Sequence, residues 1–360
     1  MTAPLPRPEP STSQDLDAIG AVAIGRNEGD RLIACLDSLI GRVGRIVYVD
    51  SGSQDGSVAE ARARGVEVVE LDTRIPFTAA RARNAGLERL LELEPGLRFV
   101  QFVDGDCEVV DGWIDRARSE LESRSELAVA CGRRRERYPE ASVYNRLADL
   151  EWDTPVGDAE ACGGDALMRV EALRQVGGFD PTLIAGEEPD LCFRLRDQGW
   201  KVARIDAEMT RHDLAMARFG QWWRRHVRAG HAYAEGACRH FQKPGRPWFR
   251  QAMSNGVWGL AVPIASLGLA WPTGGLSLLG LLGYPLIAFR ATRRQRKRGT
   301  PGGQSAIFGV SCAVSKFPQA IGELRFVANR LRGRRGALIE YKGPESPANL
   351  QAVRAVKGRR

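Results

Sequence analysis

The feature that most constrains this chain is an alternation of short apolar runs with longer stretches of helical periodicity, between Ala18 and about Phe241. The apolar runs are rich in Val, Ile and Phe and show little polar alternation, as in strands that are covered on both faces. This pattern predicts an α/β domain with a mostly parallel sheet flanked by helices. Strands are expected at residues 18–25, 45–50, 66–71 and 98–104, and helices over 30–40, 57–64 and 78–93.

Acidic and amide side chains follow three of these strands at the point where each strand ends. Asn27 and Glu28 come after the first strand, Asp50 closes the second and Asp104 closes the fourth. Ligands of open α/β sheets bind at the carboxyl ends of the strands, so these side chains are expected to converge on one edge of the sheet. We place the active site at this edge.

The segment FVDGDCEV places Asp104 and Asp106 one residue apart, directly after a buried strand. Two carboxylates this close repel each other unless a cation lies between them, and hard divalent ions prefer oxygen ligands. An Asp-Gly-Asp segment is also common in plain turns. The strand before it and the acidic residues beside it favour the metal site.

The segment VDSGSQDGS places Asp50 and Asp55 around a loop rich in Gly and Ser, between a strand and a helix. Such a loop can bind ribose hydroxyls or base edges through its carboxylates and backbone amides. The same segment is compatible with an ordinary strand-to-helix turn capped by Asp and Ser. The sequence contains neither a P-loop nor a GxGxxG segment, which argues against an ATPase and against a dehydrogenase.

The segment IAGEEPDLCFRLRDQGW predicts a helix from about Pro189 to Gln198, because Pro suits the first turn of a helix and Gly suits its end. Glu188 then lies at the helix N-terminus, where the helix dipole favours the ionised form. An ionised carboxylate facing a cleft can act as a general base towards a hydroxyl. Taken alone, Glu187, Glu188 and Asp190 could equally serve only to complement the helix dipole.

Together these segments resemble glycosyltransferase family 2, the inverting nucleotide-sugar enzymes of GT-A fold. The resemblance covers about residues 20–240 and rests on five motifs in the order of the family. They are Asn27-Glu28 after the first strand, VDSGSQDGS, ARARNAG with Arg83 and Asn84, the DGD segment, and GGFDPTLIAGEEPDLCFRLRDQGW.

The resemblance implies that a sugar passes from a nucleotide-diphosphate donor to a hydroxyl acceptor in a single displacement assisted by Mg²⁺ or Mn²⁺. Glu188 takes the position of the catalytic base, and Glu187 remains a competing candidate because the family commonly has Glu-Asp at this place. The implied metal ligands are Asp104 and Asp106, with His212 as a candidate that could also be structural. The implied donor-binding residues are Asn27, Glu28, Asp50, Asp55, Arg83, Asn84 and Asp104.

Residues on the acceptor side are less defined by the resemblance, and the candidates are Asp165, Asp190, Gln221 and Arg224. The segment QWWRR, from Gln221 to Arg225, resembles the QxxRW motif of processive polysaccharide synthases but ends in Arg where that motif has Trp. This departure puts processivity in doubt. A helix rich in Trp at this place is equally compatible with packing against the domain or a membrane surface.

The composition changes after Arg250, because residues 251–289 contain no charged side chain. Such a run is long enough for two membrane helices, with Pro272 to Gly275 as the break between them. Basic residues flank the run on both sides, which suits two crossings with both ends in the cytoplasm. We therefore expect a C-terminal helical membrane hairpin with candidate spans at 252–271 and 274–289. The alternative is a buried helical pair in a soluble domain.

The net charge of +8 belongs to the C-terminal part of the chain. From Arg290 to Arg360 there are 17 Lys and Arg against 3 Glu, a net charge of +14, so the other residues carry −6. Anchoring at an anionic membrane surface explains this better than nucleic acid, which is not an expected partner. The seven scattered cysteines contain no CxxC pair, which favours a reducing compartment and argues against a disulfide scaffold or a zinc site.

These observations divide the chain into four expected parts, listed here with their boundaries. They are a disordered leader at 1–17, a GT-A catalytic domain at 18–245, a membrane-associated helical region at 246–330 and a basic tail at 331–360. The expected place of action is the cytoplasmic side of a bacterial-type membrane, with a growing glycan or a lipid-linked acceptor. The alternatives are a nucleotidyltransferase, which would release pyrophosphate, and an inactive membrane-anchored protein that binds nucleotide sugars.

Overall fold

The computed structural model describes residues 17–334 and 336, and these residues form two compact units. The first, here called the sheet unit, comprises residues 17–137, 151–183 and 187–214. The second, here called the helical unit, comprises residues 138–150, 184–186 and the described residues from 215 onward. The expected leader falls outside the described residues except for its last residue, and so does the basic tail beyond 336.

The sheet unit is built on a nine-stranded mixed sheet in the order β3-β2-β1-β4-β8-β6-β9-β5, with β7 paired to β9. The four strands β1 to β4 run parallel to one another; the apolar runs of β1, β2 and β4 are buried, as the sequence predicted, whereas that of β3 is only half-buried. Antiparallel pairs join β8 to β4 and to β6, and β5 to β9. The strands are β1 (Ile19–Gly25), β2 (Arg45–Asp50), β3 (Glu67–Glu70), β4 (Phe99–Asp104), β5 (Cys107–Val109), β6 (Leu127–Glu136), β7 (Gly157–Asp158), β8 (Ala166–Arg169) and β9 (Lys201–His212).

Helices between the strands cover the sheet with their apolar faces. Thr78 caps one of them, α4, by accepting a hydrogen bond from the backbone N–H of Arg81 at 3.1 Å. That helix packs so closely on β1 and β2 that a Cβ on Gly86 would lie 2.4 Å from a methyl carbon of Val22. The helices of this unit are α2 (Asp30–Asp37), α3 (Ser57–Ala63), α4 (Ala79–Leu93), α5 (Trp113–Ser123), α7 (Val170–Val176) and α8 (Glu187–Asp197).

The carboxyl ends of three parallel strands lie side by side at one edge of the sheet. Gly25 at the end of β1 pairs with Asp50 at the end of β2, and Ile24 pairs with Asp104 at the end of β4. The convergence of polar strand ends that the sequence predicted is therefore confirmed by the strand register.

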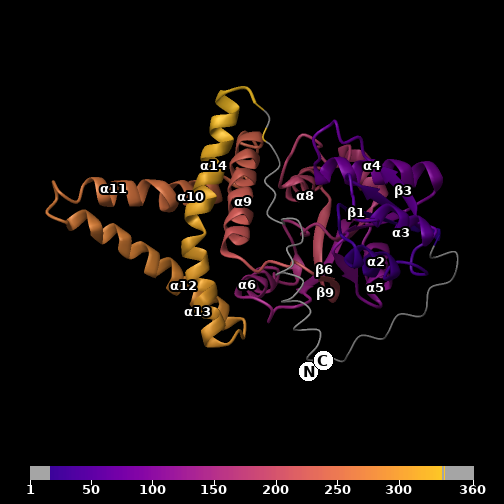
Figure 1. The fold of residues 1–360 in the computed structure, drawn as a ribbon, viewed down its shortest axis with the longest axis horizontal. Helices are drawn as coiled ribbons and strands as arrows, with labels where there is room; N and C mark the ends of the chain where they lie inside the picture. The colour runs from indigo at the N-terminus through magenta and orange to yellow at the C-terminus, as the bar shows by residue number, and fades with distance from the viewer. Residues whose placement is uncertain (1–16, 335, 337–360) are drawn as a thin grey trace. The chain divides into compact units, whose positions relative to one another are not determined.

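The helical unit is held together by close contacts between helix backbones. Along α9 and α14, which lie side by side, Gly230 faces the backbone of Gln319 and Gly322 faces the backbone of Val227 (Figure 1). The absence of a side chain at these two glycines lets the helix axes approach. The elements are α6 (Val143–Glu151), whose last residue falls in the sheet unit, α9 (Phe219–Arg239), α10 (Phe249–Gly256), the π-helix η1 (Val257–Ala261), α11 (Val262–Gly268), the 3₁₀-helix η2 (Leu276–Leu282), α12 (Gly283–Lys297), α13 (Gly302–Val314) and α14 (Lys316–Leu331).

Residues 249–297 form two arms that meet at a turn around Thr273 (Figure 1). The arms are tied by hydrogen bonds from Ser277 Oγ to the carbonyl of Ser266 at 2.7 Å and from Tyr284 to the carbonyl of Trp258 at 2.5 Å. Among the helices that the structure describes, none is both long enough and apolar enough to cross a membrane. The expected spans at 252–271 and 274–289 are therefore not supported, because the charge-free run is divided among short α, π and 3₁₀ segments and a turn.

Candidate active site

Asp106 and His212 form a buried pair beside the end of β4. The turn after β4 leads directly into β5, and Cys107 on β5 pairs with His212, the last residue of β9. This register brings Nε2 of His212 to 3.1 Å from Oδ2 of Asp106. The sequence placed both residues in a metal site from motifs about a hundred positions apart, and the structure brings them into contact.

The surroundings of His212 suit a metal ligand. Its other ring nitrogen, Nδ1, lies 3.7 Å from Oε2 of Glu136, and the indole of Trp152 meets the imidazole edge to face at 4.9 Å. A carboxylate that accepts a hydrogen bond from the second nitrogen orients a ligating imidazole, and at 3.7 Å Glu136 lies near that position without forming the bond. Carboxylate oxygen suits both Mn²⁺ and Mg²⁺, whereas imidazole nitrogen suits a transition metal, so the residues present fit Mn²⁺ better than Mg²⁺.

Asp104, the other carboxylate of the DGD segment, lies beside two arginines, of which Arg83 is buried and Arg134 is half-buried. Arg83 on α4 donates from Nη2 to its Oδ1 at 2.7 Å, and Nη2 of Arg134 on β6 lies 3.8 Å from its Oδ2. Burial alone would lower the pKa of Arg83, but the carboxylates of Asp104 and Glu187 outweigh this and raise that pKa above its ordinary value. Both arginines therefore stay charged next to the predicted metal site.

Asp165 is completely buried and holds the backbone of Asp104 by a hydrogen bond. Its Oδ1 accepts the backbone N–H of Asp104 at 3.1 Å, and its Oδ2 accepts the hydroxyl of Thr210 at 2.7 Å. The same oxygen lies 2.8 Å from Nη2 of Arg134. The sequence proposed Asp165 for the acceptor side, and in the structure its oxygens are engaged by these groups.

The two adjacent glutamates at the start of α8 have different partners. Glu187 accepts from Nη1 of Arg83 at 2.8 Å, which links it through that guanidinium to Asp104. Glu188 accepts the backbone N–H of Cys162 at 2.5 Å and lies 3.1 Å from Sγ of Cys192. Both carboxylates are buried.

The two loops that the sequence assigned to the nucleotide are joined by hydrogen bonds. Asn27, in the left-handed region at φ 56°, accepts the backbone N–H of Gln54 at 2.7 Å. Asp55 accepts the backbone N–H of Gly29 at 3.0 Å, while Asp50 accepts the backbone N–H groups that follow it in its own loop. Glu28 forms an ion pair with Arg31 at 2.9 Å. Asn27, Asp50 and Asp55 thus belong to two joined loops, here called the rim, at the ends of β1 and β2.

Asn84 and Asp190 have partners within the protein scaffold. The amide of Asn84 brackets Phe179, donating to its carbonyl at 2.7 Å and accepting from its N–H at 2.9 Å. Asp190 accepts from Arg194 at 2.8 Å, and that arginine also donates to carbonyls at the end of α7. These contacts place both side chains where they hold α4, α7 and α8 in position.

The last two predicted residues, Gln221 and Arg224, belong to the helical unit. Gln221 is buried, and its Oε1 accepts the backbone N–H groups of Ala217 and Arg218 at 2.9 and 3.0 Å at the start of α9. Arg224 is exposed on the same helix. The structure gives Gln221 a capping role and leaves the acceptor role of both residues a prediction.

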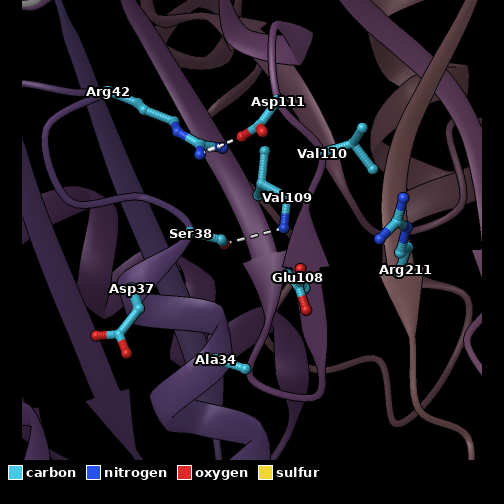
Figure 2. A pocket seen from close by; sticks show the side chains of 9 residues that line it. All are labelled: Ala34, Asp37, Ser38, Arg42, Glu108, Val109, Val110, Asp111 and Arg211. Atoms are coloured by element: carbon cyan, nitrogen blue, oxygen red, sulfur yellow. Dashed lines mark hydrogen bonds and ion pairs between the residues drawn. The ribbon is translucent and has the colours of Figure 1, made fainter. Parts of the chain in front are cut away.

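A cavity of about 480 Å³ lies elsewhere in the sheet unit, between α2 and β5 (Figure 2). Across it, Ser38 accepts the backbone N–H of Val109, and Arg42 forms an ion pair with Asp111. It is lined by Ala34, Asp37, Ser38, Arg42, Glu108, Val109, Val110, Asp111 and Arg211, which are not the predicted site residues.

Sequence reasoning missed Arg134 and Glu136, the two polar residues of β6 that complete the site. The only signal was the segment GRRRE at the end of an apolar run. Side chains of a regular strand alternate between faces, but β6 has register shifts between Cys131 and Arg133 and between Arg133 and Arg134. The position of an arginine in the sequence therefore did not reveal which one faces Asp104.

The comparisons with known proteins agree with this geometry. Residues 22–177 match the family model of glycosyl transferase family 2. The succinoglycan biosynthesis protein ExoA of Rhizobium meliloti is 25% identical over 45% of this chain and 52% of its own length. The pre-mycofactocin glycosyltransferase of Mycobacterium tuberculosis is 26% identical over 66% of this chain and 51% of its own length. The chain thus spans about half the length of these curated relatives.

Among solved structures, the mannosyltransferase PcManGT of Pyrobaculum calidifontis, in complex with GDP-Man and Mn²⁺, is similar in fold. The TM-score is 0.58 at 16% identity, and the match covers 85% of this chain and 87% of that one. This likeness concerns the fold, and it agrees with the GT-A arrangement expected from the motifs. The family model thus identifies residues 22–177 as similar to glycosyl transferase family 2, and the relatives that this chain resembles include a glycosyltransferase.

Proposed function

We propose that the chain transfers a sugar from a nucleotide-diphosphate donor to a hydroxyl acceptor with inversion at the anomeric carbon, and that it uses Mn²⁺ or Mg²⁺. The observation that carries the proposal is the contact between Asp106 and His212, next to Asp104 and at the same edge as the joined nucleotide loops. The complex of PcManGT with GDP-Man and Mn²⁺ supports a donor and an ion of this class.

The nucleotide would lie along the rim formed by Asn27, Asp50 and Asp55, where carboxylates and backbone amides meet. Asp104, Asp106 and His212 would hold the ion. When bound there, a divalent cation stabilises the negative charge that develops on the departing diphosphate. Arg83, charged and buried, keeps Asp104 and Glu187 in fixed positions without the loss of entropy that a mobile side chain would require.

Glu188 would remove the proton of the acceptor hydroxyl as the oxygen attacks the anomeric carbon. A general base must be a carboxylate within reach of that proton and have an oxygen to spare. Oε1 of Glu188 accepts the N–H of Cys162, which leaves Oε2 for the acceptor. Glu187 accepts a hydrogen bond from Arg83, so it suits the role of positioning that arginine better than the role of the base. One in-line displacement opposite the leaving diphosphate inverts the anomeric configuration.

The test is product analysis with the full chain, Mn²⁺ and a panel of nucleotide sugars that includes GDP-mannose and UDP-glucose. We expect release of nucleoside diphosphate and, by NMR, a product of inverted anomeric configuration. Asp106→Asn should reduce turnover about a hundredfold or more, since it removes a charged ligand from the ion. Asp158→Asn, at an exposed acid of β7, is the matched control and should keep the activity. Release of pyrophosphate would instead identify a nucleotidyltransferase.

We further infer that the acceptor is presented at a membrane, as a lipid-linked or growing glycan, on the cytoplasmic face of a bacterial-type membrane. What supports this is the turn between the arms of residues 249–297, which exposes large apolar side chains. Trp271 is 95% exposed and Leu276 is 68% exposed. Further along the second arm, the last turn of α12 carries Arg294, Arg296 and Lys297, which suit anionic headgroups.

A further inference from the structure

Two thiols and a carboxylate gather at the start of α8 from distant parts of the sheet unit. Cys162 lies between β7 and β8, while Glu188 and Cys192 lie one turn apart on α8. The Sγ atoms of Cys162 and Cys192 are 3.8 Å apart, and Sγ of Cys192 is 3.1 Å from Oε1 of Glu188. The three side chains are buried, and one ligand atom from each lies within 4.8 Å of the others.

These distances suit a tetrahedral ion bound by sulfur. Two thiolate sulfurs at ~2.3 Å from a tetrahedral zinc ion lie roughly 3.8 Å apart. The observed separation of the two Sγ atoms already has this value, and the carboxylate needs only a small adjustment to complete a third ligand position. The 30-residue separation in sequence concealed the pair, because a search for CxxC spacing finds only ligands that are close along the chain.

We propose that Cys162, Cys192 and Glu188 form a second metal site, which binds a thiophilic divalent ion such as Zn²⁺ and thereby inhibits the enzyme. The site differs from that of Asp106 and His212, which has one neighbouring thiol, Cys107, because a pair of thiolates selects Zn²⁺ over Mg²⁺ and Mn²⁺ more strongly than a single one. Its inhibitory role rests on the proposed function of Glu188 as the base, whereas its binding role does not.

The protein holds the three ligands in place before an ion arrives. The backbone N–H of Cys162 donates to Oε1 of Glu188, which ties the segment between β7 and β8 to α8. The hydrogen bond with Cys162 together with burial raises the pKa of Cys192, and burial raises that of Cys162, so both thiols are protonated at first and release their protons when an ion binds. The neighbours Ala161 and Gly163 are exposed, so an ion can approach from the side of Cys162.

Inhibition follows from the ligand set. An ion bound to the two sulfurs draws the carboxylate of Glu188 into its coordination sphere, and a coordinated carboxylate is a poor proton acceptor for the sugar hydroxyl. Donor binding at the rim and at Asp106 would be unaffected, because neither uses these thiols. The expected signature is a lower kcat with an unchanged KM for the nucleotide sugar.

Binding is tested by titrating Cd²⁺ into the reduced full chain and measuring the sulfur-to-metal charge-transfer absorption. All proteins carry Cys238→Ser, which removes an exposed thiol. We expect a band that saturates with one ion per chain, that disappears in Cys162→Ser and in Cys192→Ser, and that persists in Cys35→Ser. Cys35 is the matched control because it is a buried thiol on α2, outside the cluster. No band in the parent, or a band that survives both cluster substitutions, would overturn the proposal.

Inhibition is tested by turnover at saturating Mn²⁺ with added Zn²⁺. We expect about a tenfold or greater loss of kcat in the parent, reversed by a chelator followed by fresh Mn²⁺, and less than about a twofold loss in Cys192→Ser. A charge-transfer band without inhibition would disprove the regulatory role while the binding site stands. If neither the parent nor Cys192→Ser transfers sugar, while the parent still shows the Cd²⁺ charge-transfer band, the result counts against the proposed function and not against the metal site.

Discussion

At the scale of single residues, the two adjacent glutamates of α8 are distinguished by what they touch. Glu187 accepts a hydrogen bond from Arg83, and the same guanidinium also donates to Asp104. The negative charge of Glu187 is therefore paired with an arginine that it shares with Asp104. Glu188 is bound to a backbone N–H and lies beside a neutral thiol. The sequence alone left the choice of base open between them, and their contacts now favour Glu188.

Substitution by glutamine separates the two roles, because it removes the charge and preserves the shape. Glu188→Gln should lower kcat about 10²- to 10⁴-fold with little change in the donor KM, since it removes the proton acceptor. Glu187→Gln should affect kcat less and raise the donor KM, because Arg83 loses one of its charged partners. Steady-state kinetics with varied donor measures both. The reverse order of effects on kcat would make Glu187 the base.

The site residues that could be predicted from the sequence are those that lie within short motifs. Asp104 ends a strand, Asp106 follows it, and Glu188 lies in the first turn of a helix, so the local pattern contains their position. Arg134 and Glu136 are different, because their inward direction depends on the irregular register of β6 against β9. No period-two pattern survives such a shift, and therefore only the three-dimensional structure reveals these two residues.

At the scale of elements, three hydrogen-bonded polar side chains join α10 to α14 inside the helical unit. Lys316 donates to Oδ1 of Asn255 at 2.8 Å, and Asn255 donates to Oε1 of Glu323 at 3.0 Å. Burial raises the pKa of Glu323 to about 7, although the hydrogen bond from Asn255 and the charge of Lys316 oppose the shift. The junction of these helices is therefore sensitive to pH.

The direction of this sensitivity follows from the two pKa values of Glu323. In the folded chain the carboxyl group of Glu323 keeps its proton up to about pH 7. In the unfolded chain it loses the proton near 4.5, the ordinary pKa of a glutamate. The free energy of unfolding should therefore fall as the pH rises from about 4.5 to about 7. Glu323→Gln keeps the acceptor for Asn255 and removes the titration, so it should stabilise the chain at pH 8 by about 1 kcal/mol, because solvent screening reduces the full effect.

Thermal unfolding of the full chain at pH 5 and pH 8 measures this difference. Glu140→Gln, at an exposed acid of the helical unit, is the matched control and should change neither melting temperature. If Glu323→Gln lowers the melting temperature at pH 8, the ionised carboxylate stabilises the junction and the argument fails.

The elements themselves were predictable where one physical signal dominated. The buried parallel strands stood out as continuous apolar runs, and β2 was predicted at its observed bounds. The segment 251–289 is also a continuous run without charge, but its sequence does not show whether protein, lipid or water surrounds it. Its lack of charge suits a span, a buried pair or an exposed hairpin equally, and only contacts such as those of Asn255 with α14 decide where it packs.

At the scale of the whole molecule, the distribution of charge and apolar surface gives the chain two chemically different parts. Residues 1–289 carry −6 and contain the carboxylates of the active site, while residues 290–360 carry +14. The turn at Trp271 and Leu276 exposes apolar surface of the kind that monomeric proteins rarely leave in water. This combination supports the proposed attachment to a membrane surface, because apolar insertion and attraction to anionic lipid can act together.

Flotation of the full chain with lipid vesicles tests this arrangement. The chain should bind vesicles that contain phosphatidylglycerol more tightly than vesicles of phosphatidylcholine alone, and added salt should weaken the binding because it screens the basic residues. Substituting both Trp271→Ser and Leu276→Ser should weaken binding about tenfold or more, since each apolar side chain contributes about 1.5–3 kcal/mol when buried. Ile75→Ser is the matched control, an exposed apolar residue of the sheet unit at 52% exposure, and should bind like the parent. If the double variant floats as well as the parent while salt still releases both, the basic residues alone hold the chain at the lipid, and the turn has another role.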